Sequence, residues 1–198
     1  MINTLEVLGY VSGLGMLLTA LPYIRDILRG KTKPERASRF IWAVLMAVSA
    51  FSQFAKGGTF SVLFTAFNGL GVLSIAILSI WYGVGGFTKR DKIGLCGVAL
   101  SLILWYFTRE PAVALILVII IDFIGAILTI MKSYEHPETE TLSMWLWAAV
   151  FGTLGALSVG SWNPILVAFP IYIGSIDLIT AIVIILGRRR LREKTGSL

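Results

Sequence analysis

The chain has 198 residues, of which 57% are hydrophobic and 14% are charged, and its formal net charge is +6. Soluble domains have about 45–50% apolar and about 25% charged residues, so a soluble core of this length could not bury so much apolar surface. The single cysteine, Cys96, excludes an intrachain disulfide and a cysteine-ligated metal cluster. We therefore expect an integral membrane protein.

Seven apolar segments approach the length of about 20 residues that a membrane-spanning helix needs. The predicted helices are residues 4–28, 37–55, 60–83, 92–108, 111–132, 140–159 and 163–187. No basic segment precedes the first of them, so we expect it to be retained and not cleaved as a signal peptide. Pro111 and Pro164 lie where a helix would begin, a place that tolerates the missing N–H of proline. The predicted fold class is all-α, because lipid requires backbone polar groups to be satisfied within each segment.

Lysine and arginine are concentrated in alternate breaks between these helices. The breaks after the first, third and fifth helices and the C-terminal tail hold most of them, whereas the other breaks hold only Lys56 and Arg109. Basic residues favour the cytosolic side of a membrane. We therefore expect a multi-pass protein of the plasma (inner) membrane, with its N-terminus outside and its C-terminus in the cytosol. The basic residues flank helices, so we expect them to contact anionic lipid headgroups and expect no nucleic acid partner.

Two parts of the chain match each other at a constant offset in the numbering. The matches other than simple apolar ones are Pro34-Glu35 with Pro137-Glu138, Trp42 with Trp145, Gly57 with Gly160 and Gly71 with Gly174. They predict two parallel three-helix repeats, residues 4–87 and 110–187. A linker helix at 88–109 would join the repeats, and a basic cytosolic tail at 188–198 would follow. Secondary transporters use such repeats and bind solute at the interface between them.

The segment LPYIRDILRGKT, residues 21–32, places a proline inside the first helix and ends in a basic turn, and Ser38 and the second helix follow. It resembles the proline-glutamine motif of the PQ-loop superfamily, which includes the SWEET and SemiSWEET (MtN3-type) sugar transporters. That superfamily uses a plan of three helices, one linker helix and three helices. The chain departs from the motif at Tyr23, where glutamine is usual, and at Gly125-Ala126, where the second copy lacks the proline.

The resemblance implies a uniporter or proton-coupled carrier of a small polar solute, first of all a sugar. Transport would proceed by alternating access between two triple-helix bundles. The resemblance also implies that an asparagine of the third helix and an aromatic residue near the end of the second contact the solute, here Asn68 and Phe51. Tyr172 lies beside Ile171, the position that matches Asn68 in the second repeat. We therefore expect an asymmetric pocket that includes Tyr172.

Asp122 and Asp177 are the two carboxylates deep inside predicted spans. Ionisable groups in lipid are costly and usually serve a function. Without a lysine or arginine at similar depth, each is either protonated or faces a watery cavity. They could bind a cationic or hydroxylated solute, or exchange a proton during transport. The alternative without function is a hydrogen bond that links neighbouring helices.

Pro22 removes one intrahelical hydrogen bond and loosens the first helix at that point. With Gly125, which occupies the matching place in the second repeat, it forms a pair of candidate hinges. A static kink is the alternative interpretation of Pro22.

Other functional classes receive less support. A retinal-binding receptor needs a lysine in the last helix, and residues 163–187 contain none. No nucleophile motif or cluster of His, Asp and Glu indicates an enzyme, and we expect neither a cofactor nor a metal site. The main alternative to a carrier is a non-transporting seven-helix receptor or sensor with the same fold. The expected partners are a small-molecule solute and the lipid bilayer, and a homo-oligomer is compatible with the sequence.

Overall fold

The computed structural model describes residues 3–30, 34, 36–83, 89–108, 110–135, 137–140 and 142–196. This part of the chain is helical and contains no strand, which confirms that the fold is all-α. Its elements are α1 (Thr4–Leu28), α2 (Arg36–Ala55), α3 (Ser61–Tyr82), α4 (Lys89–Thr108), α5 (Pro111–Glu135), a short 3-10 helix η1 (Pro137–Thr139), α6 (Leu142–Leu157) and α7 (Pro164–Gly196). Residues 31–33 and 35 of the predicted motif region, and the predicted repeat boundaries at 87, 88 and 109, lie outside the described residues.

The helix ends follow the local sequence. Pro111 and Pro164 begin α5 and α7 as predicted. The side chain of Asn163 accepts a hydrogen bond of 3.1 Å from the backbone N–H of Ile165, which satisfies one of the free donors at the start of α7. At the other end, α7 continues past the predicted end at residue 187 to Gly196. The residues after Gly187 are mostly strong helix formers, so the predicted tail is largely a helical extension.

In the part of the chain that the structure describes, three helical stretches are long and apolar enough to cross a membrane: Thr4–Leu28, Ser61–Tyr82 and Pro164–Glu193. Shorter apolar stretches lie at Arg39–Ala55, Pro111–Phe123 and Leu142–Leu157. The outer surface of the bundle also carries many large apolar side chains, among them Leu18, Phe54, Trp81, Phe107 and Trp162. Soluble monomers rarely expose apolar surface on this scale, so the surface is suited to association with a membrane.

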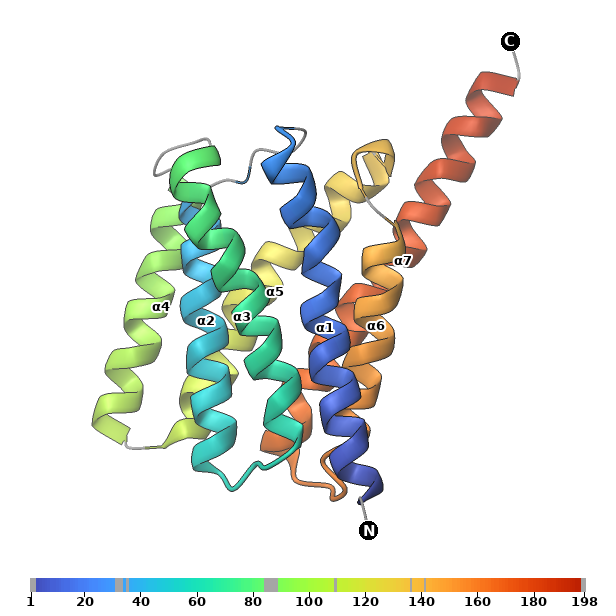
Figure 1. Ribbon diagram of the computed structural model, residues 1–198. Coiled ribbons are helices and arrows are strands. Elements are labelled where there is room, and N and C mark those ends of the chain that lie inside the picture. Colours follow the sequence, from blue (N-terminus) through green and yellow to red (C-terminus); the bar gives the residue numbers. More distant parts are fainter. Residues whose placement is uncertain are drawn as a thin grey trace.

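The first three helices and the last three, called the first and second triplets, pack in the same pattern. In the first triplet α3 packs against α1 and α2, and in the second α7 packs against α5 and α6. Between the triplets, α1 contacts α6 and α2 contacts α5. Exchanging the triplets leaves this pattern unchanged. Helix α4 lies at the edge of the bundle against α5 and α2 (Figure 1).

The helices alternate in direction. The C-terminal ends of α1, α3 and α5 lie at one end of the bundle, called the upper end because it is uppermost in Figure 1. The C-terminal ends of α2, α4 and α6 lie at the lower end. There Lys56 forms an ion pair with Glu110, and the hydrogen bond from Lys56 lowers the pKa of the Glu110 carboxyl. This contact ties the turn after α2 to the start of α5.

Two pairs of residues that match in the sequence also have matching environments. Gly57 follows α2 with φ of 83°, and Gly160 follows α6 with φ of 67°. Both backbones are thus in the left-handed region that favours glycine. Pro34 and Pro137, which precede α2 and α6, are both fully buried. The structure therefore repeats the turn chemistry of the first triplet in the second.

Gly57→Ala is expected to lower the free energy of unfolding by about 1–2 kcal/mol, because an L-residue with a Cβ is strained by that amount in the left-handed conformation. A Cβ at Gly57 would have no heavy atom within 4 Å, so the loss would report backbone strain alone. Unfolding of the purified protein in detergent micelles, followed by circular dichroism, measures it. Thr59→Ala, at an exposed position in the same turn, is the control and should change stability by less than about 0.5 kcal/mol. Equal stabilities for the two variants would contradict the prediction.

Candidate functional site: a cavity between the two triplets

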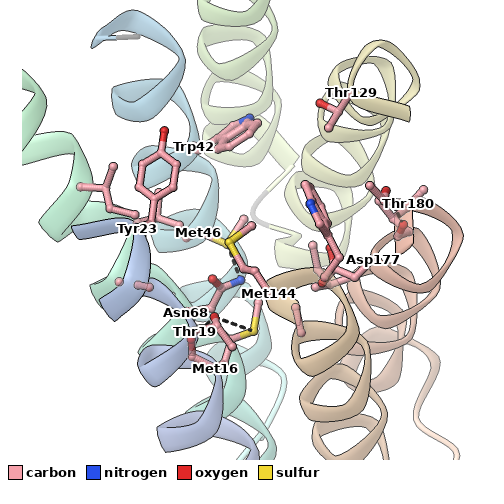
Figure 2. Close-up of a pocket in the computed structure, with 18 of the residues that line it drawn as sticks. Met16, Thr19, Tyr23, Trp42, Met46, Asn68, Thr129, Met144, Asp177 and Thr180 are labelled. Atoms are coloured by element: carbon pink, nitrogen blue, oxygen red, sulfur yellow. Dashed lines mark hydrogen bonds between the residues drawn. The ribbon is translucent and has the colours of Figure 1, made fainter. Parts of the chain in front are cut away.

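A cavity of about 180 Å³ lies between the triplets (Figure 2). All six helices of the two triplets line it, and none of its described lining residues comes from α4. The lining positions on α1 are 16, 19, 20 and 23, those on α3 are 68, 71, 72 and 75, and those on α7 are 173, 176, 177 and 180. This i, i+3, i+4, i+7 spacing means that each of these helices presents a single face to the cavity.

Fully buried aromatic and aliphatic side chains close the cavity toward the lower end. Phe64, Leu115 and Phe169 belong to a buried cluster that includes the lining residues Met16 and Met46. Just beyond, the Gln53 amide donates a hydrogen bond of 2.9 Å to the Thr65 hydroxyl and joins α2 to α3. Nearer the upper end, several lining side chains are only half-buried, among them Tyr23, Arg39 and Trp42. Its lower end is therefore the more tightly packed one.

Three of the predicted site residues line the cavity together: Asn68 on α3, Asp122 on α5 and Asp177 on α7. Tyr172 contacts the site indirectly, since its hydroxyl donates a hydrogen bond of 2.7 Å to Oδ2 of Asp122. Phe51 is not among the lining residues and is 52% exposed on α2. The structure thus brings four of the five predicted residues together and leaves Phe51 outside the group.

The two candidate hinges lie next to the cavity rather than in it. Pro22 is exposed and sits inside α1, which continues as a helix on both sides of it. Its neighbour Tyr23 lines the cavity. Gly125 lies within α5, directly before the lining residue Ala126. Both positions therefore adjoin matching parts of the cavity wall.

Asp177 has the most unusual environment in the site. It is 7% exposed, and its Oδ2 is buried without a hydrogen-bond partner among the described residues. Asp122, on α5, lines the same cavity. Figure 2 shows its side chain on the cavity wall across from Asn68 and Met46. A desolvated carboxylate needs either a proton or a positive partner, so this oxygen is available to a bound group.

The Asn68 amide also has unused hydrogen-bonding capacity within the cavity. Its Nδ2 donates to the Sδ of Met46 at 3.5 Å (Figure 2), and a thioether sulfur is a weak acceptor. A ligand oxygen would be a stronger partner for this donor. Asn68 and Asp177 therefore place polar groups from both triplets on one cavity.

Arg39 and two tryptophans form the part of the wall nearest the upper end. Arg39 donates a hydrogen bond of 2.7 Å from Nη2 to the Tyr23 hydroxyl, and its guanidinium lies over the rings of Tyr23 and Trp42 at 4.7 and 5.0 Å from their centroids. On the other triplet, the indole N–H of Trp145 donates to the Glu140 carboxylate at 3.2 Å. These aromatic side chains flank the cavity where it approaches the upper end.

The sequence did not predict Arg39, Trp42 or Trp145 as cavity residues. Arg39 lies within the predicted second helix, residues 37–55, and within α2. The match of Trp42 with Trp145 was the signal that could have found the tryptophans, because the same residue at both matched positions suggests a shared role at the repeat interface. The charge pattern gave no comparable signal for Arg39.

The lining faces also correct the matching of the third helices. The sequence offset pairs Asn68 with Ile171, but Ile171 is 45% exposed and does not line the cavity. When the cavity-facing positions of α3 are matched with those of α7, Asn68 corresponds to Ile173 and Val72 corresponds to Asp177. A shift of two residues turns a helix by about 200°, so it moves a side chain to the opposite face.

No protein-family model, characterised protein or solved structure matches the chain. The resemblance to the PQ-loop superfamily therefore continues to rest on the motif around Pro22 and on the helix plan.

Proposed function

We propose that the protein is a seven-helix membrane carrier, similar to the PQ-loop and SWEET-like transporters, that moves a small polar solute by alternating access between its two triplets. The observation that carries this proposal is the position of the cavity. It lies between the triplets, receives residues from all six of their helices and holds polar groups with unused bonding capacity. Relative movement of the triplets would change access to such a site more than movement within either one.

The exchange-symmetric packing of the triplets supports this mechanism. The α1–α6 and α2–α5 contacts correspond to each other, so an exchange of their geometries would give a second, related arrangement of the same interface. Transporters built from repeats use this kind of relation to open alternately on the two sides of a membrane. With the basic upper end in the cytosol, the present arrangement would face inward, and the packing around Phe64 and Phe169 would form the outer barrier.

In this proposal Pro22 and Gly125 are the points at which α1 and α5 bend. Proline weakens the helix by removing one backbone hydrogen bond, and glycine by its backbone freedom. Each precedes a residue of the cavity wall, so a small bend would shift Tyr23 or Ala126 against the bound solute. The seven-span arrangement, with the N-terminus outside and the C-terminus in the cytosol, is part of the same proposal.

Asn68→Ala is expected to reduce solute uptake about tenfold, because loss of a hydrogen bond to a bound solute costs about 1.4 kcal/mol. The experiment uses proteoliposomes of the purified protein and a panel of labelled sugars, amino acids and amines. Ser74→Ala is the matched control, since Ser74 lies on α3 but on its exposed side, where its hydroxyl donates only to the Leu70 carbonyl.

Uptake of no solute in the panel would contradict the carrier proposal. Saturable binding without uptake would instead support the receptor or sensor alternative, because the same cavity could bind a solute without changing its access.

A further inference from the structure

We infer that the solute of this cavity is a small organic cation, whose ammonium group binds between Asp177 and Asp122. The inference rests on the proposed function, because it names the class of solute for the same site. It differs from the expectation of a sugar, which came from the resemblance and not from the residues of the cavity.

Among the described residues of the cavity wall, no basic side chain is free to pair with the two carboxyl groups. Among the described lining residues Arg39 is the one basic side chain, and its guanidinium is already held by the hydrogen bond to Tyr23 and by the rings of Tyr23 and Trp42. Tyr172 supplies a neutral donor to Asp122. Two acidic groups thus face the cavity, and no basic side chain in the described part of the site is placed to pair with them.

Asp177 shows where the positive group would bind. Its Oδ2 is buried and has no hydrogen-bond partner among the described residues, although a buried carboxylate oxygen normally has one. An N–H of an ammonium group would satisfy this oxygen and would offset the repulsion between the two carboxyl groups. A quaternary ammonium would supply the charge without the N–H. A neutral hydroxyl would supply a donor but no positive charge to pair with an ionised carboxylate.

The remaining walls favour an organic cation over a metal ion. Methionine, isoleucine and valine side chains make up much of the lining, and aromatic rings stand at its upper part. Aromatic faces and thioethers suit the alkyl groups around an ammonium nitrogen. Hard cations such as Ca²⁺ need six to eight oxygen ligands, and the described residues contain no group of three or more His, Cys, Asp or Glu that could hold a metal.

The size of the cavity suits a compact solute. Its volume is about 180 Å³, and a protein cavity of about 150 Å³ accepts a molecule the size of benzene. Simple amino alcohols and small alkylammonium ions are of this size. The proposed solute is therefore one compact ammonium ion with a short alkyl body.

The test compares cations with uncharged molecules of the same shape. Choline is measured against 3,3-dimethylbutan-1-ol, and ethanolamine against propan-1-ol, by titration calorimetry on the purified protein in detergent micelles. At least one cation should bind at least about tenfold more tightly than its neutral counterpart, which corresponds to about 1.4 kcal/mol. Equal binding within both pairs, or no binding by either cation, would overturn the inference.

Variants then show whether the preference for the cation depends on Asp177. Asp177→Asn should remove the preference for the cation, while Asp177→Glu, which keeps the charge, should retain part of it. Glu110→Gln, which removes a carboxylate at the lower end, is the control and should leave the preference unchanged. A preference that survives Asp177→Asn at full strength would overturn the assignment of the ammonium site. The comparison within the wild-type protein decides the solute class even if Asp177→Asn fails to fold.

Failure of this inference and failure of the proposed function give different results. Uptake of a neutral sugar that Asp177→Asn leaves unchanged, with no binding of the cations, would overturn the cation inference and keep the carrier. Selective binding of a cation with no uptake into proteoliposomes would keep the cation site and overturn the carrier.

Discussion

Gly152→Val is expected to lower the free energy of unfolding by about 3 kcal/mol. Helices α6 and α7 approach so closely at this point that a Cβ at Gly152 would lie 2.7 Å from the Cα of Gly174 and 2.8 Å from its backbone nitrogen. Backbone atoms cannot move aside as a flexible side chain can, so the two helices would have to separate. Denaturant titration in detergent micelles, with helix content followed by circular dichroism, measures the loss.

The control is Gly69, a glycine at which an added Cβ would have fewer and more distant neighbouring atoms than at Gly152. At Gly69 on α3, a Cβ would have one near neighbour, the Cβ of Met46 at 3.2 Å. Gly69→Ala should therefore cost less than about 1 kcal/mol, since the helix propensity of alanine offsets part of the contact. Equal stabilities of Gly152→Val and Gly69→Ala would contradict the close contact between α6 and α7 at Gly152.

Much of the helical arrangement could be predicted from local signals. Apolar runs of membrane length placed the helices, and Pro111 and Pro164 marked two starts that the structure confirms. The end of α7 could not be predicted in the same way, because the hydropathy signal stops at the basic residues while the backbone remains helical to Gly196. Arg190 also stabilises that extension, since its Nη2 donates to the Tyr134 carbonyl and its guanidinium lies over the Tyr134 ring. Such a contact between distant segments has no sequence signal.

A residue of the candidate site could be predicted from the sequence where a polar side chain stands in an otherwise apolar helix. Asp122 and Asp177 are costly in an apolar helix, so each could be singled out from the sequence, and the structure places both on one cavity. Phe51 was chosen by resemblance alone, and its helix turns it outward. The rotation of each helix about its axis decides which residues face inward. That rotation depends on the packing of all six helices. An error of two positions in the matching of residues, as between Ile171 and Ile173, places a side chain on the opposite face of its helix.

Ala126→Trp is expected to reduce transport to the background of empty liposomes while the protein stays folded. Ala126 lines the cavity one turn after Asp122, so an indole ring there would occupy most of the space available to a solute. Uptake into proteoliposomes and helix content together measure the two parts of the prediction. Ile127→Trp is the control, since Ile127 is the next residue on α5 and is 42% exposed on the outer surface.

The two triplets explain why this position should matter. Tyr23 of the first triplet and Ala126 of the second occupy matching places, and both line the cavity. The tyrosine fills its side of the wall and holds Arg39 through its hydroxyl. The alanine leaves the opposite side open next to Asp122. Because Ala126 stands where the first triplet has an aromatic ring, the cavity keeps its volume and a solute can reach the carboxyl groups. Uptake at the wild-type rate by Ala126→Trp would mean that the solute takes another path through the protein.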